Sequence, residues 1–413
     1  MKKFLNLFLV VAVIFSMINF AQAKENLPEK YRLEKILIFS RHNVRSPTVT
    51  LSKTLNQFTH FNWQWTAGPG ELSLRGGVLE TEMGQYFRKY LENENFITAQ
   101  YVPTEGEFRF YANSRQRTFA TAKFFSSGLL PVANVEIEHK YKLEKMEEMF
   151  ENDFEGTGEN FREKIIAKLF SENNVKNFAE LTEKFKPSTD LIERTVDFKN
   201  SSYAKRNNLQ HFPKNDFAVE VSEKNSVTFK GGLHTATGIS DALLMQFYEN
   251  PSRINEKQLE KIMQLHDIET DAIFADSTSA GIAAKPLLKF IYDELLSDRR
   301  FSFICGHDTN VRAILTALDV EDYFLPDTLE PKTPIGVKFV VEKRISPDGQ
   351  AYADIYLVYA NLKQIKNMEV LSLEYPPYVV KLDFKNLNRT ENGLYLYSDF
   401  IKRLDDTVAK ADF

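Results

Sequence analysis

The stretch ILIFSRHNVRSP, residues 36–47, decides how the chain is organised. It begins with four consecutive apolar residues, Ile36 to Phe39, which predict a buried strand. It ends in a polar cluster that contains Arg41, His42 and Arg45 and no carboxylate. A histidine between two fixed cations, with no acid beside it, indicates one half of an anion-binding site.

Two further segments follow the same plan of a buried strand, a polar turn and a helix. The apolar run 108–112 leads into Asn113-Ser114-Arg115-Gln116-Arg117, and the run 301–305 leads into Gly306-His307-Asp308-Thr309-Asn310. In both cases apolar residues at helical spacing come next. This repetition predicts the α/β class, with a largely parallel sheet flanked by helices. Ligands bind at the carboxyl ends of such strands, so we expect the three polar clusters to meet at one edge.

The middle of the chain has a different character. Residues 140–269 are rich in charge and carry helical patterns, for example at 143–150, and they lack strand-like runs before helices. We interpret them as an inserted, mostly α-helical lobe. The α/β catalytic domain then consists of residues 24–139 and 270–413, in which the last strands, around a turn at 346–349, are expected to be antiparallel edge members.

The N-terminal segment predicts export. Three residues, Met1-Lys2-Lys3, precede an apolar run that ends in Ala21-Gln22-Ala23, which is typical of a signal peptide, residues 1–23, cleaved after Ala23. A membrane anchor is the competing interpretation, because the run approaches the length of a spanning helix. We expect a periplasmic or secreted protein without a membrane segment after cleavage. The single cysteine, Cys305, allows no internal disulfide, which a large core tolerates.

Charge and histidine spacing exclude several classes of function. The chain has 52 Lys and Arg against 57 Asp and Glu, so no general attraction to nucleic acid or anionic lipid is expected. Of seven histidines, only His42 and His307 lie at predicted strand ends, and no pair has the spacing of a helical zinc site. We therefore expect no metal site and no cofactor. His266, beside Asp267, is interpreted as part of a solvated helix end, and the oligomeric state stays open.

The chemistry of the first cluster fits attack on phosphorus. Neighbouring cations disfavour the imidazolium form, so His42 is expected to stay neutral and to keep a nucleophilic lone pair. Arg41 and Arg45 can hold phosphate oxygens with forked donors, Arg117 would add a clamp from a second strand, and His307 a further donor. The alternatives are a structural anion site, or arginines that pair with distant carboxylates.

An acid is still needed to protonate the leaving alcohol. Asp308, next to His307 at a predicted strand end, is the candidate. A helix N-cap is a competing role for Asp308, because aspartate favours that position. We interpret Asn113 and Ser114 as turn formers.

Three motifs resemble one enzyme family. RHNVRSP, residues 41–47, resembles the R-H-G-x-R-x-P signature of the histidine acid phosphatases, in the histidine phosphatase superfamily, branch 2. HDTN, residues 307–310, is similar to their second signature, and YANSRQRTFATAKFF, residues 111–125, resembles the segment that delivers a third arginine. The match extends over most of the mature chain and is most specific at these three places.

The resemblance implies a two-step phosphatase. It implies a phosphohistidine intermediate on His42, with Asp308 as proton donor and an α-helical lobe as one wall of the pocket. The implied phosphate ligands are Arg41, Arg45, Arg117, His307 and Thr48. We expect a metal-independent enzyme, most active in acid, whose partner is a small-molecule phosphate monoester. Phytases are related, so inositol phosphates are an alternative substrate; a secreted binding protein without turnover is an alternative of another class.

Some positions are similar to the bacterial periplasmic glucose-1-phosphatase branch of the family. Asn43 replaces the usual glycine of the first signature, and GGVLE at 76–80, the segment 314–319 and TPIG at 333–336 are also similar to that branch. The resemblance therefore favours sugar phosphates such as glucose 1-phosphate. One departure is that exported relatives usually carry several disulfides. The sequence offers no physical role for Asn43.

Overall fold

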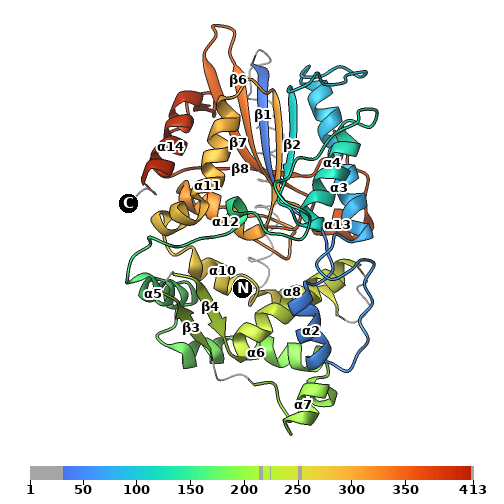
Figure 1. The fold of residues 1–413 in the computed structure, drawn as a ribbon, viewed down its shortest axis with the longest axis vertical. Helices are drawn as coiled ribbons and strands as arrows, with labels where there is room; N and C mark the ends of the chain where they lie inside the picture. Colours follow the sequence, from blue (N-terminus) through green and yellow to red (C-terminus); the bar gives the residue numbers. More distant parts are fainter. Residues whose placement is uncertain (1–30, 214–216, 224, 250–253, 411–413) are drawn as a thin grey trace, which may run out of the picture.

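A mixed sheet forms the centre of the upper half of the molecule (Figure 1). The computed structural model describes residues 31–213, 217–223, 225–249 and 254–410, so the predicted signal peptide lies outside the described residues. Among the helices in these ranges, none has both the length and the apolar character needed to cross a membrane. The strands of the sheet are β1 (Arg32–Arg41), β2 (Phe108–Ala112), β5 (Phe301–Gly306), β6 (Lys338–Ile345), β7 (Ala351–Tyr359), β8 (Tyr378–Lys381) and β9 (Tyr395–Leu396).

The predicted α/β class is confirmed, and less of the sheet is parallel than predicted. The three strands that precede the polar clusters pair in parallel in the order β2, β5, β1, with Arg41 opposite Gly306 and Ala112 opposite Cys305. The pairs β1 with β6, β6 with β7, and β7 with β8 and β9 are antiparallel. The predicted turn at 346–349 joins β6 to β7 as an antiparallel hairpin, but the predicted edge position is wrong for β6, which lies between β1 and β7 inside the sheet.

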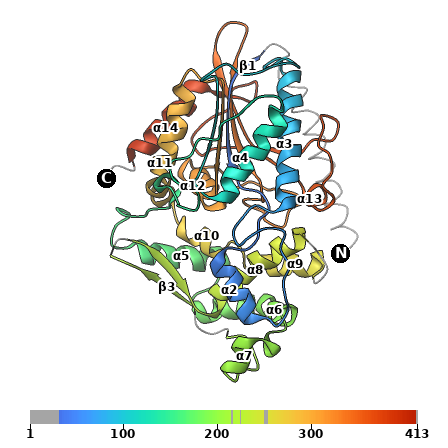
Figure 2. The ribbon, with the colours of Figure 1, turned by 45° about the vertical axis from the view of Figure 1, so that its right-hand side comes forward.

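Helices cover both faces of the sheet (Figures 1 and 2). Alternate residues of β1 point to opposite faces, so Ile36 and Ile38 pack into the core under α3 and α4, while Leu37 and Phe39 pack into the core under α11, α12 and α14. All four side chains are fully buried. The helices are α3 (Leu74–Asn93), α4 (Gln116–Leu129), α11 (Ser277–Leu296), α12 (Asp308–Ala317), α13 (Leu362–Asn367) and α14 (Tyr397–Lys410).

A second group of elements lies beyond the carboxyl ends of the parallel strands, in the lower half of Figure 1. It is mostly helical and also contains the hairpin β3–β4. The helix α2, although it comes early in the chain, joins this group by packing on α8. The elements are α2 (Val49–Phe58), η1 (Glu148–Phe150), α5 (Phe161–Asn173), α6 (Phe178–Thr195), η2 (Phe198–Asn200), α7 (Ser202–Arg206), β3 (Ala218–Val221), β4 (Val227–Lys230), α8 (Gly232–Glu249), α9 (Glu256–Met263) and α10 (Ile268–Ile273).

One helical pattern of the sequence does not form a helix. Residues 143–150 contain no α-helix, only the three-residue 3-10 helix η1. The carboxylate of Glu147 accepts hydrogen bonds from the Tyr111 hydroxyl at 2.8 Å and from the Lys140 backbone amide at 3.0 Å, which ties this segment to β2. Tertiary contacts here outweigh a weak local preference.

Candidate active site

The predicted meeting of the polar clusters is found at the carboxyl ends of β1, β5 and β2. The rings of His42 and His307 lie edge to face, with 5.5 Å between their centroids. Arg117, in the first turn of α4, has Nη2 at 3.3 Å from Nδ1 of His307. Arg41, the last residue of β1, has Nη2 at 3.3 Å from Oδ2 of Asp308. Residues from three distant segments therefore form one cluster.

Arg45 and Thr48, the remaining predicted ligands, lie in different surroundings. Nη2 of Arg45 is 3.1 Å from Oδ2 of Asp241, which belongs to α8. Thr48 is the N-cap of α2, where its hydroxyl accepts a hydrogen bond from the Leu51 amide at 3.4 Å. Thr48 thus has a structural role, and its role as a phosphate ligand stays a prediction.

His42 has the protonation state of a nucleophile. Its side chain is buried, and burial, followed by the charge of Arg117 and of the other surrounding cations, holds the pKa of the imidazole well below its usual value. Nδ1 lies 2.9 Å from the carbonyl oxygen of Asn43. A carbonyl oxygen can only accept, so Nδ1 carries the proton and Nε2 keeps a free lone pair. The ring therefore stays neutral to a lower pH than a solvated histidine does.

The second histidine is oriented by a buried amide. Oδ1 of Asn113 accepts from the Glu147 backbone amide at 3.1 Å, which leaves its Nδ2 facing Nε2 of His307 at 2.7 Å. The shorter contact, from Asn113, makes Nε2 the acceptor, so Nδ1 carries the proton, and the Arg117 guanidinium 3.3 Å away lies beside that N–H without bonding to it. Burial, then the charge of Arg117, holds the pKa of His307 well below its usual value. The Nδ1–H of His307 and the nearby guanidinium are adjacent donors, an arrangement suited to one anionic oxygen.

The interpretation of Asn113 as a turn former missed this contact. Asn113 is fully buried and its amide has three partners: Glu147, His307 and the sulfur of Met146. The one signal for this contact in the sequence was the position of Asn113 directly after the predicted strand 108–112.

Several buried nitrogen atoms of the site arginines are left without a hydrogen-bond partner from the described residues. Arg41 is fully buried and pairs with Glu330, and burial, opposed more strongly by the charges of Glu330 and Asp308, leaves its pKa raised. The Nε atoms of Arg41, Arg45 and Arg117 have no hydrogen-bond partner among the described residues, and Nη2 of Arg41 has only its ion pair with Asp308. Buried donors of this kind are satisfied by a bound anion. The partner Glu330 was not identified from the sequence.

A chain of charged residues continues behind Arg45 into the helical group. His266 has Nδ1 at 2.8 Å from Oδ1 of Asp267 and Nε2 at 3.8 Å from Oδ1 of Asp241. Burial lowers the pKa of His266, but these carboxylates outweigh it and raise the pKa well above the usual value. Burial also opposes ionisation of Asp241, yet Arg45 and His266 hold its pKa well below the usual range.

The predicted solvated helix end at His266 is wrong. Helix α9 ends at Met263, and the following loop places the imidazole against α8, where only 11% of its side chain is exposed. Helical periodicity indicates which residues face inward along one helix, and it contains no information about a partner on another helix.

Asp308 does not occupy the N-cap position that was its competing role. His307 is the N-cap of α12, and Asp308 is the first helical residue. One carboxylate oxygen of Asp308 accepts from the Thr309 amide at 2.8 Å, and the other lies near Arg41. Its side chain is 30% exposed, so the carboxyl group has contact with both the arginine cluster and solvent.

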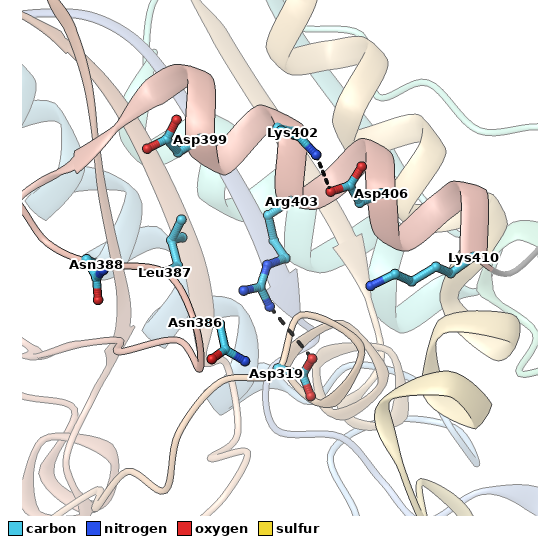
Figure 3. Close-up of a pocket in the computed structure, with 9 residues that line it drawn as sticks. All are labelled: Asp319, Asn386, Leu387, Asn388, Asp399, Lys402, Arg403, Asp406 and Lys410. Atoms are coloured by element: carbon cyan, nitrogen blue, oxygen red, sulfur yellow. Dashed lines mark hydrogen bonds and ion pairs between the residues drawn. The ribbon is translucent and has the colours of Figure 1, made fainter.

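A separate groove runs along α14 (Figure 3). Its charges pair with one another, Lys402 with Asp406 at 2.6 Å and Arg403 with Asp319 at 3.7 Å. The groove is lined by Asp319, Asn386, Leu387, Asn388, Asp399, Lys402, Arg403, Asp406 and Lys410, which include none of the predicted site residues.

Known proteins match this chain along most of its length. The family model described as histidine phosphatase superfamily (branch 2) matches residues 32–280. The chain belongs to this family. The phosphatase is 30% identical to a glucose-1-phosphatase of Salmonella typhimurium, over 99% of this chain and 100% of the relative, and 29% identical to a glucose-1-phosphatase of Providencia rettgeri, over 95% of both chains. It is a phosphoric monoester hydrolase of the histidine acid phosphatase type.

The fold of the phosphatase also has solved counterparts. The apo form of Hafnia alvei phytase superimposes with a TM-score of 0.81 at 24% identity, over 94% of this chain and 99% of that one. The phytase of Citrobacter braakii gives a TM-score of 0.79, also at 24% identity, over 92% and 99% of the two chains. At this level of identity the likeness concerns the fold.

Proposed function

We propose that this phosphatase is exported, to the periplasm or outside the cell, and hydrolyses sugar phosphates such as glucose 1-phosphate in acid through a phosphohistidine on His42. The observation that carries the proposal is the neutral His42 ring, whose free Nε2 lone pair lies inside a cluster of arginines. The two glucose-1-phosphatases among its relatives support the choice of substrate.

The first step is transfer of the phosphoryl group to the enzyme. Nε2 of His42 attacks phosphorus, the P–O bond to the sugar breaks, and Asp308, protonated beforehand, gives its proton to the leaving alcohol. The phosphate oxygens are held by the donors of Arg41, Arg45, Arg117 and His307, with Thr48 as a further predicted ligand. Positioning and charge neutralisation by arginines lower the barrier.

The second step returns the enzyme to its starting state. The carboxylate of Asp308 takes a proton from a water molecule as the water oxygen attacks phosphorus. The N–P bond breaks, its electron pair returns to Nε2 of His42, and inorganic phosphate leaves. The partial exposure of Asp308 supports this step, because water must reach the carboxylate.

We also infer which residues form the catalytic domain and which form the lobe beside it. Residues 24–139 and 270–413 form the catalytic domain, and residues 140–269 form the lobe that closes one side of the pocket. The contact between Asp241 of α8 and Arg45 supports this division, because it brings a lobe side chain to a phosphate ligand. Helix α2 (Val49–Phe58) is an exception, because it belongs to the segment 24–139 and yet packs on α8 of the lobe.

A phosphate-release panel tests the proposal. We expect the highest kcat/KM with glucose 1-phosphate, lower values with other sugar phosphates and myo-inositol hexakisphosphate, and no loss of activity with EDTA. His42→Ala should abolish turnover. His211→Ala is the matched control, because 79% of the His211 side chain is exposed and it pairs with Glu193 outside the cluster. Wild-type turnover by His42→Ala, or inactivation by EDTA, would contradict the mechanism.

Phytase activity is the second candidate. The phytase AppA of Escherichia coli is 25% identical to this chain over 88% of both sequences. A kcat/KM for myo-inositol hexakisphosphate above that for glucose 1-phosphate would favour it. Binding of phosphate without release of phosphate from any ester would instead identify a binding protein.

A further inference from the structure

Three positions that resemble the glucose-1-phosphatase branch, Asn43, Glu80 and Gly336, are in contact although they are far apart in the sequence. Nδ2 of Asn43 donates to Oε1 of Glu80 at 2.8 Å. Gly336 has φ of +67°, and a Cβ atom there would lie 2.6 Å from Nδ2 of Asn43 and 3.2 Å from Oε1 of Glu80. Glycine therefore leaves the space that the amide fills.

The carboxylate of Glu80 is held in turn by a buried lysine. Nζ of Lys338 lies 3.0 Å and 3.2 Å from the two oxygens of Glu80, and both side chains are fully buried. Lys338 also donates to Oγ of Ser40 at 3.2 Å and to the carbonyl oxygen of Gly336 at 2.9 Å. A buried ion pair whose donors all have partners is a rigid anchor for the amide that binds to it.

This cluster is connected to the nucleophile through the backbone. The carbonyl oxygen of Asn43 accepts Nδ1–H of His42 at 2.9 Å, and the Gly336 amide donates to the carbonyl oxygen of His42 at 3.2 Å. Oδ1 of Asn43 accepts a hydrogen bond from the Val44 backbone amide at 2.7 Å, and the backbone amide of Asn43 donates to Oγ1 of Thr121 at 3.2 Å. The amide side chain thus anchors the peptide whose carbonyl orients the His42 ring.

We propose that Asn43, anchored by Glu80 and accommodated by Gly336, is a positioning residue that aims Nε2 of His42 at phosphorus. The proposal rests on the proposed function, in which His42 is the nucleophile. Without the amide the Asn43 carbonyl can turn, and the imidazole turns with it. The arginines that hold the phosphate are unaffected. Loss of the Asn43 side-chain amide should therefore lower the rate of phosphoryl transfer and leave substrate binding unchanged.

Two substitutions address the contact from opposite sides. Asn43→Gly removes the amide, and Gly336→Ala introduces a methyl group against it. We expect each to lower kcat between about 10- and 100-fold, because small displacements of reacting groups have effects of this size, with KM within about twofold of the wild-type value. In the double variant the added methyl has no amide to displace, so we expect a loss of kcat close to that of Asn43→Gly alone.

The decisive measurement is the single-turnover rate at which the enzyme becomes phosphorylated by p-nitrophenyl phosphate, followed by rapid quenching. Asn173→Gly is the control for loss of a buried asparagine, because its amide donates to Leu169 within α5, and the wild-type phosphorylation rate is expected. Thermal unfolding of all variants checks that each is folded at the assay temperature.

The outcomes separate this proposal from the proposed function. If the wild-type enzyme turns over without forming a phosphoenzyme, the proposed mechanism fails. If the wild-type enzyme forms it and Asn43→Gly does so at the same rate, the positioning role is refuted and the mechanism stands. Multiplicative losses of kcat in the double variant would also overturn the coupling between Asn43 and Gly336.

Discussion

The tautomer of His307 depends on the side-chain amide of Asn113, and Asn113→Asp replaces this hydrogen-bond donor with an acceptor. The substitution keeps the shape of the side chain and the oxygen that accepts from the Glu147 amide at 3.1 Å. It replaces the donor 2.7 Å from Nε2 of His307 with a carboxylate oxygen. An acceptor facing Nε2 requires a proton on that nitrogen, so the imidazolium form is stabilised.

The expected change in the pKa of His307 is large. A carboxylate at this distance raises the pKa of its neighbour by about 1–3 units, and each unit corresponds to about 1.4 kcal/mol. In the wild type the pKa of His307 is depressed, so the neutral ring with its Nδ1 proton persists to a lower pH than in a solvated histidine. In the variant, Nδ1 keeps a proton only below the raised pKa, because above it the remaining proton stays on Nε2 beside the new carboxylate.

The pH profile and the imidazole spectrum both report this change. We expect kcat/KM for glucose 1-phosphate to gain an alkaline limb at the new pKa and to stay within about tenfold of the wild type below it, since the imidazolium still offers Nδ1–H. Nitrogen-15 spectra of the wild-type enzyme should show His307 protonated on Nδ1. Asn173→Asp, in α5, is the control for a new buried carboxylate. A wild-type ring protonated on Nε2, or an unchanged His307 titration in the variant, would refute the reasoning.

Three further predictions concern stability and the proton donor. Lys338→Met should destabilise the protein by about 3–5 kcal/mol, because it leaves Glu80 buried without its cation; at about 2.1 cal/mol/K of unfolding entropy per residue, this lowers the melting temperature by about 4–6 °C. Glu80→Leu combined with Lys338→Met should recover part of that loss, and an equal or larger loss would contradict it. His266→Gln should destabilise the protein more at acid pH than at alkaline pH, as measured by thermal unfolding. The pKa of His266 is raised in the folded state, so the stability it contributes is fully present below the unfolded-state pKa and is lost as the pH rises through the folded-state pKa. Equal losses of stability at the two pH values would exclude a charged His266. Asp308→Asn should lower kcat/KM, which reports the phosphorylation step alone, by about 100-fold or more for glucose 1-phosphate and much less for p-nitrophenyl phosphate, because nitrophenolate leaves without a proton. An equal loss of kcat/KM with both substrates would remove Asp308 as the acid.

Local pattern alone predicted the part of the site that lies on parallel strand ends. The apolar runs before Arg41, Asn113 and His307 each indicate a strand that runs into a helix, and parallel strands bring their carboxyl ends to one edge. The cluster of Arg41, His42, Arg117 and His307 follows from this rule, because each residue keeps a short, constant distance along the chain from its strand.

Other features depend on contacts between segments that no periodicity connects. The turn at 346–349 was visible in the sequence, but the central place of β6 beside β1 was not, because strand order depends on which faces pack together. The contact of Asp241 with Arg45 and the burial of His266 likewise require that α8 and the loop after α9 meet the end of β1.

Asn43 illustrates the difference between what the sequence determines and what only tertiary packing determines. The sequence by itself determined the α/β class, the strand ends that carry the predicted site residues, and the position of Asn43 next to His42, because these are properties of short segments. The tertiary structure alone decided what that side chain contacts. Glu80 on α3, Lys338 on β6 and the space beside Gly336 come together only after the sheet and its covering helices have packed, and a buried amide acquires its role from the partners that packing places around it.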